Sequence, residues 1–384
     1  MKIVHLCLAS FYIDNYSYQE NLIPKYHREM GHDVVVIASL VTFDEQGRNC
    51  FLEHPGEYIC KDGYKVIRVD YKPFLKPVNV IIRRYVNLFS LLEHEKPSVI
   101  FVHGCQFLDI RYVVKYVKKN PGVKVYVDNH ADFINSGTNW LSKNILHKII
   151  WRYCAQAIAP YTEKFYGVTP ARCKFLTDVY NIPPAKIELL VLGADDAKIP
   201  FDSRLAVKEQ IREKYNISAD DFLLVTGGKI NERKNIHLLM QAVAQLPKIK
   251  LLIFGNCTQE MAPVIAELGK ADNIRYIGWI DPDKAYSYFL ASDLIIFPGT
   301  HSVLWEQAVG CGIPCVFKYW VGMDHVDTGG NCRFLHDESV DGIKEVIIEI
   351  TESEGVYDKM KAVAAGPGRE DFLYTRISKK AIGC

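Results

Sequence analysis

The sequence predicts an α/β protein made of two Rossmann-like domains that face each other across a cleft. Short apolar segments with strand character alternate with amphipathic helical patterns along all 384 residues, as in parallel sheets covered on both faces. The alternation starts again after a seam at residues 192–202. A chain of this length can form two domains with well-buried cores.

The first half begins with a strand and continues as alternating elements. Its apolar runs predict strands at residues 2–8, 33–38, 64–70, 98–103, 124–129, 156–160 and 187–192. One helix is predicted from Tyr18 to Met30, where Gly31 ends it. Another is predicted over residues 78–92, where apolar side chains recur on one face.

The second half repeats this order. Strands are predicted at residues 221–228, 249–255, 274–278, 293–299 and 313–318, and helices begin near Asn235, Thr258, Asp283, Ser302 and Val340. We therefore expect domains at residues 1–195 and 196–365. Residues 366–384 can form a last helix of the second domain or cross back to the first, and we assign them the crossing position.

Composition narrows the class of protein. With 49% hydrophobic and 24% charged residues the chain is globular. No apolar run reaches spanning length, and the start MKIVHLCLAS runs directly into a strand, so we expect no signal peptide, no transmembrane helix and a cytoplasmic location. The eleven cysteines include no C-x-x-C pair and are expected to be buried, reduced thiols.

Charge is unevenly distributed. Residues 1–195 hold 24 Lys and Arg against 19 Asp and Glu, whereas the second half is slightly acidic. A basic first domain fits an anionic acceptor or peripheral contact with the inner face of a membrane, and a solvated surface fits equally well. We expect no nucleic-acid binding, because no strongly basic face with interleaved aromatic residues is evident.

Two lysines follow a predicted strand of the second domain. Gly227 and Gly228 end this strand and allow a tight turn. Lys229 and Lys234 lie between that turn and the next helix, whose N-terminus attracts anions. Lysines placed there would bind the two phosphates of a diphosphate and stabilise its charge as it departs. A solvated basic turn is the alternative.

A carboxylate occupies the corresponding place after another strand. Glu306 falls in the first turn of a predicted helix, after the short loop Thr300, His301, Ser302 and Val303. Such a carboxylate can accept hydrogen bonds from two ribose hydroxyls, and the loop would lie at the sugar and the β-phosphate. The alternative is an acidic residue that favours the helix dipole, with Ser302 as N-cap.

Polar residues also follow strands of the first domain. His130 comes directly after the strand at 124–129, where it can hydrogen-bond a sugar or an acceptor. His103 has the same place one strand earlier, and Asp128 and Asp132 are less specific candidates. Ligands of open parallel sheets bind beyond the carboxyl ends of the strands, so all of these are expected at the cleft.

Two further motifs bear on cofactors. The loop from Asp14 to Glu20 contains Ser17 and Tyr18 but no glycine, so it is not the G-x-G-x-x-G of nicotinamide or flavin enzymes. Asp281 and Asp283 form a D-x-D, which binds a metal in some sugar transferases but here precedes a helix, where Asp is a natural cap. We predict no metal and no cofactor.

With these motifs the chain resembles the retaining family-four glycosyltransferases of the GT-B fold, the glycosyl transferases group 1, of the bacterial polysaccharide type. The matching segments are Gly31-His32-Asp33-Val34, His130, Val191–Asp195, Gly228-Lys229 with Lys234, Tyr276–Ile280, Glu306–Pro314 and the terminal Phe372-x-Tyr pattern. There are three departures. A family glycine pair near residues 16–18 is absent, a family arginine is Lys229, and the first of two family glutamates is missing because the loop before Glu306 is shortened.

The resemblance implies a metal-independent enzyme with an N-terminal acceptor-binding domain and a C-terminal domain that binds a nucleotide sugar of UDP or GDP type. Lys229, Lys234 and His130 would be catalytic. The donor would lie against Gly228, Glu306, the loop Thr300 to Val303, and Ile277, Gly278 and Trp279 at the base. Ser17, Tyr18, His103 and Asp132 would lie on the acceptor side, and the acceptor would be a glycan or a lipid-linked sugar.

Two other classes remain open. One is a GT-B-fold nucleotide-sugar epimerase, which would act on the donor alone. The other is a catalytically inactive nucleotide-sugar-binding relative, which the missing glutamate favours and the two lysines disfavour. The nucleotide base, the sugar, the acceptor, the linkage and the oligomeric state depend on loop shapes that the sequence does not specify.

Overall fold

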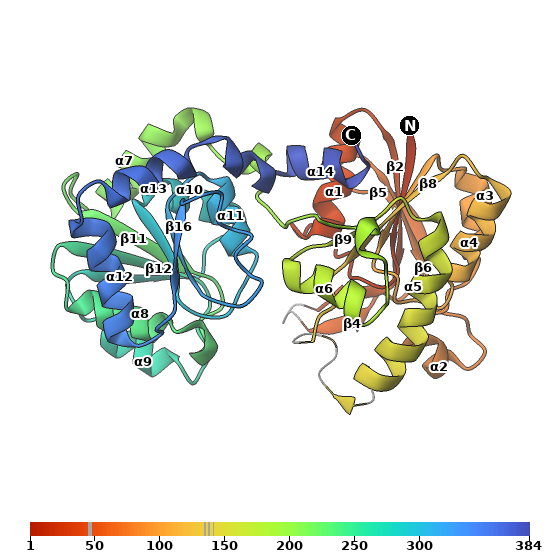
Figure 1. Cartoon of the computed structure of the whole chain (residues 1–384), viewed down its shortest axis with the longest axis horizontal. Helices are drawn as coiled ribbons and strands as arrows, with labels where there is room; N and C mark the ends of the chain where they lie inside the picture. Colours follow the sequence, from red (N-terminus) through yellow and green to blue (C-terminus); the bar gives the residue numbers. More distant parts are fainter. Residues whose placement is uncertain (45–47, 134–135, 137–138, 141) are drawn as a thin grey trace. The chain divides into compact units, whose positions relative to one another are not determined.

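The computed structural model describes residues 1–44, 48–133, 136, 139–140 and 142–384. Within them the chain forms two compact units, one of Met1–Val191 with Tyr374–Cys384 and one of Leu192–Leu373, each built on its own sheet (Figure 1). The boundary therefore follows Val191, close to the expected one after Asp195, and the segment that belongs to the first unit begins at Tyr374 rather than at residue 366.

The first unit contains an eight-stranded sheet of order β10-β9-β8-β7-β1-β2-β6-β5. All neighbours are parallel except β5 and β6. The strands are β1 (Lys2–Cys7), β2 (Asp33–Ser39), β5 (Gly56–Ile59), β6 (Lys65–Val69), β7 (Val99–His103), β8 (Lys124–Asn129), β9 (Lys164–Gly167) and β10 (Ile187–Leu189). A separate hairpin pairs β3 (Val41–Phe43) with β4 (Asn49–Phe51).

Helices cover both faces of this sheet, because side chains of successive strand residues point to opposite faces. On one face, α1 (Gln19–Glu29) and α14 (Tyr374–Ala381) pack against Ile3 and Phe101. On the other, four helices pack against Val4, Leu6 and Val102. These are α3 (Leu88–Glu95), α4 (Ile110–Lys119), α5 (Arg152–Ile158) and α6 (Pro170–Asp178).

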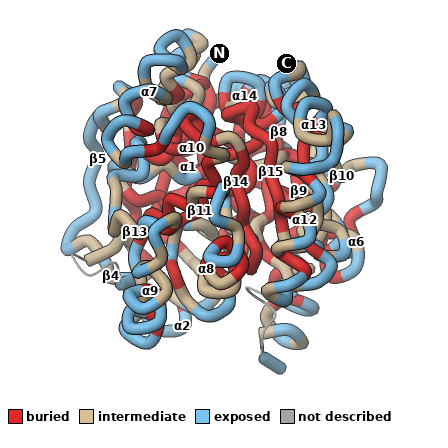
Figure 2. Tube along the Cα trace, turned by 90° about the vertical axis from the view of Figure 1, so that its left-hand side faces the viewer, coloured by how far each residue is buried: buried red, intermediate tan, exposed pale blue. Residues whose placement is uncertain are grey.

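The second unit has a fully parallel six-stranded sheet of order β13-β12-β11-β14-β15-β16. Its strands are β11 (Phe222–Gly227), β12 (Ile249–Phe254), β13 (Ile274–Gly278), β14 (Leu294–Phe297), β15 (Cys315–Lys318) and β16 (Cys332–Leu335). Its helices are α7 (Arg204–Lys214), α8 (Ile236–Ala244), α9 (Ala262–Leu268), α10 (Ala285–Ala291), α11 (Leu304–Gly310), α12 (Val340–Glu352) and α13 (Val356–Ala364). The tube is buried along β11, β14 and β15 (Figure 2), as expected for central strands with helices on both faces.

Two sequence predictions were wrong. Residues 156–160, predicted as a strand, lie in α5 and a following 3-10 turn, and the strand is β9 instead; a five-residue apolar run does not distinguish the two structures. The single helix expected over 78–92 is divided into α2 (Lys76–Ile81) and α3, because Arg83 and Asn87 adopt left-handed backbone angles, with φ of 53° and 56°. None of the helices in the described part of the chain is long and apolar enough to cross a membrane.

Candidate functional site

The loops after β11 and β14 touch at the carboxyl edge of the second sheet. These strands are neighbours in the sheet, so the loops that follow them emerge side by side. The backbone N–H of Thr300 donates to the carbonyl oxygen of Arg233 at 3.0 Å. A Cβ on Gly299 would lie 2.4 Å from that oxygen and from the Lys234 Cα, so a larger residue could not allow this approach.

Lys234 fastens the two loops to each other. Its Nζ donates to the carbonyl oxygens of Thr300 at 2.5 Å and His301 at 3.1 Å. Burial, with a smaller contribution from the charge of Arg233, lowers the pKa of Lys234 to about 8. Lys229 is exposed beside Gly228, whose φ of 105° suits glycine. The structure therefore places one exposed and one half-buried ammonium on the loop that the sequence assigned to a diphosphate.

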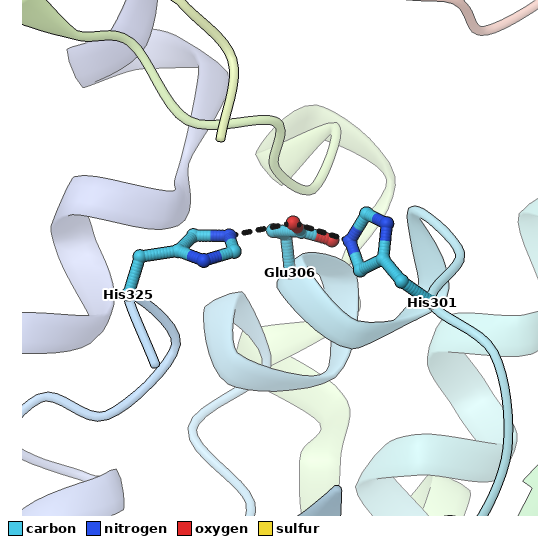
Figure 3. Close-up of side chains that lie close together, drawn as sticks. All are labelled: His301, Glu306 and His325. Atoms are coloured by element: carbon cyan, nitrogen blue, oxygen red, sulfur yellow. Dashed lines mark hydrogen bonds and ion pairs between the residues drawn. The ribbon is translucent and has the colours of Figure 1, made fainter. Parts of the chain in front are cut away.

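Glu306 in α11 is held between two histidines (Figure 3). Its Oε1 accepts from the Nε2 of His301 at 2.8 Å and from the Nε2 of His325 at 2.9 Å. Burial alone would raise the pKa of Glu306, but His301 and then His325 outweigh it and hold the pKa to about 2. The carboxylate is therefore ionised at neutral pH.

This arrangement leaves Glu306 Oε2 closed to solvent and without a hydrogen-bond partner in the described part of the chain. A buried acceptor with no donor carries a cost, which two hydroxyl groups of a ligand would relieve. The His301 side chain is 19% exposed and covers this carboxylate from the loop. Because Oε2 is closed to solvent, the predicted ribose contact requires a local rearrangement that exposes this oxygen.

Among the described residues, His301, Glu306 and His325 form a group that could hold a metal ion, since their ligand atoms lie within 4.8 Å of one another. Zinc holds such ligands at about 2.0–2.2 Å, which would separate tetrahedral ligand atoms by about 3.4 Å. The separations of 2.8 and 2.9 Å between nitrogen and oxygen are those of direct hydrogen bonds. The geometry favours a hydrogen-bonded clamp on the carboxylate.

The other predicted donor residues lie along the same edge or near it. Ile277 and Gly278 end β13, and Trp279 follows with its side chain 63% exposed. Ser302 does not cap α11, because the helix begins at Leu304 with Val303 in the cap position. The side chain of Asp281 accepts from the N–H of Asp283 at 3.0 Å, which confirms the cap.

The first unit has a cavity of about 600 Å³ at the carboxyl ends of β1, β7 and β8. His130, predicted as catalytic, and Tyr18, predicted on the acceptor side, both line it. Its wall comprises Ala9, Ser10, Phe11, Tyr18, Glu20, Phe43, Ile81, Arg83, Gly104, Gln106, His130, Ala131, Ser136, Ser142, Leu146, His147 and Trp151. Burial would lower the pKa of His130, but Asp128 and Glu20 outweigh it and raise the pKa.

The remaining predicted residues of the first unit lie outside this wall. His103 is fully buried behind it, with Nδ1 2.9 Å from Asp128 Oδ2. It has no exposed surface from which to contact an acceptor, which corrects its predicted role. Asp132 pairs with Arg172 at 3.1 Å, and Ser17 is half-buried but does not line the cavity.

Several site residues were missed by sequence reasoning. His325 lies in the loop after β15, and the rule that sites follow strands could have found it. Arg83 belongs to a helical pattern in the sequence, yet its left-handed backbone turns the chain, and its guanidinium donates to the carbonyl oxygen of Gln106 at 2.9 Å. His147 lines the cavity, and burial lowers its pKa to about 4. No local signal marks Arg83 or His147.

Known protein families match both units. The Glycosyltransferase Family 4 model matches residues 21–198, and the Glycosyl transferases group 1 model matches residues 207–365. The chain belongs to the group 1, family-four glycosyltransferases. The chain is 24% identical over 174 residues to the lipopolysaccharide core biosynthesis glycosyltransferase LpsE of Rhizobium meliloti, a match that covers 44% of the chain and 46% of LpsE. The matched part thus spans less than half the length of that relative.

Solved structures show that the fold of this chain is GT-B. The Anabaena protein HepE, in complex with UDP, superposes with a TM-score of 0.67 at 15% identity, over 99% of this chain and 98% of that one. A UDP-GlcNAc 2-epimerase from Neisseria meningitidis, bound to UDP-GlcNAc, superposes with a TM-score of 0.59 at 14% identity, over 99% and 98%. The fold is therefore shared by transferases and an epimerase, and the side chains must distinguish them.

Proposed function

We propose that this protein is a retaining, metal-independent glycosyltransferase that moves a sugar from a nucleotide-diphosphate donor of UDP or GDP type to a hydroxyl of a glycan or lipid-linked acceptor in surface polysaccharide synthesis. The contact between the loops after β11 and β14 carries the proposal. It gathers Lys229, Lys234, His301 and Glu306 at one sheet edge, and family membership adds that this edge belongs to a sugar transferase.

The site chemistry fits a departing diphosphate. Lys229 is free to move with its exposed side chain, whereas Lys234 is held by two carbonyl oxygens. Together they would bind the phosphates and neutralise the charge that develops as the sugar bond breaks. The leaving phosphate oxygen can then take the proton of the acceptor hydroxyl, so no protein base is required. Glu306 would bind the ribose once its Oε2 is exposed.

The surface beside the first-unit cavity supports a lipid-linked acceptor and peripheral membrane contact. Large apolar side chains are exposed on two segments that also line the cavity, the α2 region and the π-helix Ser142–Trp151 with its flanks. We call this set the apolar rim; it comprises Phe74, Leu75, Val78, Ile81, Trp140, Ile149 and Tyr153, which are 48–82% exposed. Lys76, Lys143 and Lys148 are exposed between them. Apolar side chains with interspersed lysines suit the surface of an anionic bilayer.

A nucleotide-sugar epimerase is the second candidate, because one shares the fold. It would act on the donor without an acceptor. A thermal-shift screen against UDP, GDP, ADP and CDP and their sugars, without added metal, names the base if one nucleotide family stabilises the protein. Incubation of that donor alone then separates the candidates, since isomerised donor would contradict transfer, and donor consumed only with acceptor would support it.

The role of Glu306 can be separated from general binding. We expect Glu306→Gln to weaken UDP binding several-fold and to leave the binding of 2′,3′-dideoxy-UDP unchanged, because the missing hydroxyls cannot contact the carboxylate. Glu345→Gln, an exposed change on α12, is the matched control. An equal loss for both nucleotides would place the ribose elsewhere.

A further inference from the structure

A line of buried polar side chains crosses the first unit from α14 to the cavity wall. The Nε2 of His27, on α1, lies 2.8 Å from the carbonyl oxygen of Ser378 on α14. His5 on β1 lies 3.0 Å from His27, between Nε2 and Nδ1, and 3.1 Å from His103, between Nδ1 and Nε2. His103 Nδ1 then lies 2.9 Å from Oδ2 of Asp128. We call His27, His5 and His103 the histidine relay; all three rings are fully buried.

The two ends of this line fix the number of protons within it. The carbonyl oxygen of Ser378 can only accept, and so can an ionised Asp128. Each of the four contacts needs one proton between its two atoms, so the line needs four protons. Three neutral imidazoles carry only three. The fourth proton must make one ring an imidazolium or protonate Asp128.

The surroundings of Asp128 keep it ionised. Its Oδ1 accepts from the N–H of Gly104 at 3.0 Å, and His130 Nε2 lies 3.4 Å from its Oδ2. Burial alone would raise the pKa of Asp128, but His130 and then His103 outweigh it and lower the pKa. A carboxylate that accepts from several donors favours the charged form, so the fourth proton belongs to a ring.

The ring beside the carboxylate is the favoured holder. Burial lowers the pKa of His27 to about 4 and also lowers the pKa of His5. Within the described residues neither ring has a hydrogen bond to a carboxylate, whereas His103 contacts Asp128 directly. An opposite charge at that distance strongly favours the charged form in a buried site.

We propose that the histidine relay holds one excess proton on His103 and thereby keeps Asp128 ionised beside His130. The three rings are positioning residues, since none of them lines the cavity, whereas His130 does. Helix α14 takes part, because the carbonyl oxygen of Ser378 sets which nitrogen of each ring carries a proton. Without that acceptor only three contacts would remain, and three neutral rings would satisfy them.

Nitrogen NMR of the full-length protein, labelled with 15N at histidine, tests the proton count at pH 7.5. We expect both ring nitrogens of His103 to be protonated, and His5 and His27 to be protonated at Nε2 alone. The ring nitrogen signals of His103 are identified as those that are absent from the spectrum of His103→Asn. A singly protonated His103 in the unmodified protein would overturn the proposal, whatever the variants do.

Two substitutions should push the relay in opposite directions. Asp128→Asn turns the end acceptor into a donor toward His103, whose ring should then carry its proton on Nε2 alone. His27→Phe removes the other end, so His103 should then keep its proton on Nδ1 alone. His27→Gln can donate to Ser378 and accept from His5, and should restore the doubly protonated ring. The same His103 tautomer in Asp128→Asn and His27→Phe would contradict the relay.

The consequence for turnover rests on the proposed sugar transfer, whereas the proton count does not. We expect His27→Phe to lower kcat about tenfold with the donor KM unchanged, and His27→Gln to recover it, because His130 acts on bound substrate. His94→Phe, an exposed change on α3, should alter neither kcat nor the signals of His5, His27 and His103. If the unmodified protein gives the expected spectrum but transfers no sugar, the proposed function is rejected and the proton count stands. If the enzyme is active and kcat is equal in all variants, the positioning role is rejected.

Discussion

Lys234 and Thr300 are joined by a hydrogen bond of 2.5 Å from the lysine Nζ to the backbone carbonyl oxygen. The second bond, to His301, continues the contact along the same loop. One side chain thus fixes the loop that carries the Glu306 clamp and also presents positive charge at a helix N-terminus. Loss of Lys234 should therefore disturb both the loop and the bound phosphates.

We expect Lys234→Ala to lower transfer at least a hundredfold. Removal of one donor to a developing anion costs about 10²–10³ in kcat, and the loosened loop adds to the loss. Steady-state kinetics with donor and acceptor measure this. Lys248→Ala, an exposed lysine of the same unit, is the matched control. Activity within twofold of the unmodified enzyme would remove Lys234 from the catalytic set.

Nucleotide affinity should fall as the pH rises through about 8. The pKa of Lys234 is lowered to about 8 by burial, so its charge is lost there in the free protein, well below the range of an ordinary lysine. A bound diphosphate favours the charged form, so binding of UDP or GDP takes up a proton above this pH. Titration calorimetry from pH 6.5 to 9 measures it. Lys234→Ala should flatten the profile, and an unchanged slope in that variant would assign the effect to another group.

Because of Glu306, the free energy of unfolding of the second unit should decrease at acidic pH. Its pKa is about 2 in the folded chain and 4.5 as an ordinary glutamate. Because the folded value is the lower one, the stabilisation is complete above pH 4.5 and is lost as the pH falls toward 2, by about 3 kcal/mol. Urea unfolding at pH 7 and pH 3 should show a smaller difference for Glu306→Gln than for the unmodified chain. Glu345→Gln should behave as unmodified.

We expect no dependence of transfer on a divalent metal. The two His–Glu contacts have hydrogen-bond lengths, and the Asp281 side chain caps its own turn. Activity should be the same with EDTA as with added Zn²⁺, Mg²⁺ or Mn²⁺. Stoichiometric zinc that disappears in His325→Ala would identify the clamp as a metal site and overturn this prediction.

The apolar rim should bind anionic membranes. We expect the protein to sediment with vesicles that contain phosphatidylglycerol and not with vesicles of phosphatidylcholine alone, because lysines lie among the exposed apolar side chains. Phe74→Ser with Leu75→Ser should reduce binding at least fivefold. Leu205→Ser, which replaces a side chain 76% exposed on the second unit, should not. Equal binding of both variants would place membrane contact elsewhere or nowhere.

Local patterns determined most of the architecture. The apolar runs located eleven strands of the two sheets and the starts of α8, α10, α11 and α12, because a buried parallel strand needs apolar residues on both faces. The post-strand rule placed Lys229, Lys234, Glu306 and His130 at the carboxyl edges of the two sheets, where ligands of such sheets bind. The assignment of strands from apolar runs failed for residues 156–160, because a short apolar run fits a helix equally well.

By itself the sequence determined two α/β units, their boundary to within a few residues, and the loops that carry charge. It could not assign partners to those charges. Only the tertiary structure decided that His325 joins His301 on Glu306, that Lys234 is bonded to backbone carbonyls, and that His103 faces inward to Asp128. The physical reason is distance along the chain. Apolar periodicity is set by neighbouring residues, whereas the protonation and reach of these buried side chains depend on groups that are 19 to 66 residues away in the sequence.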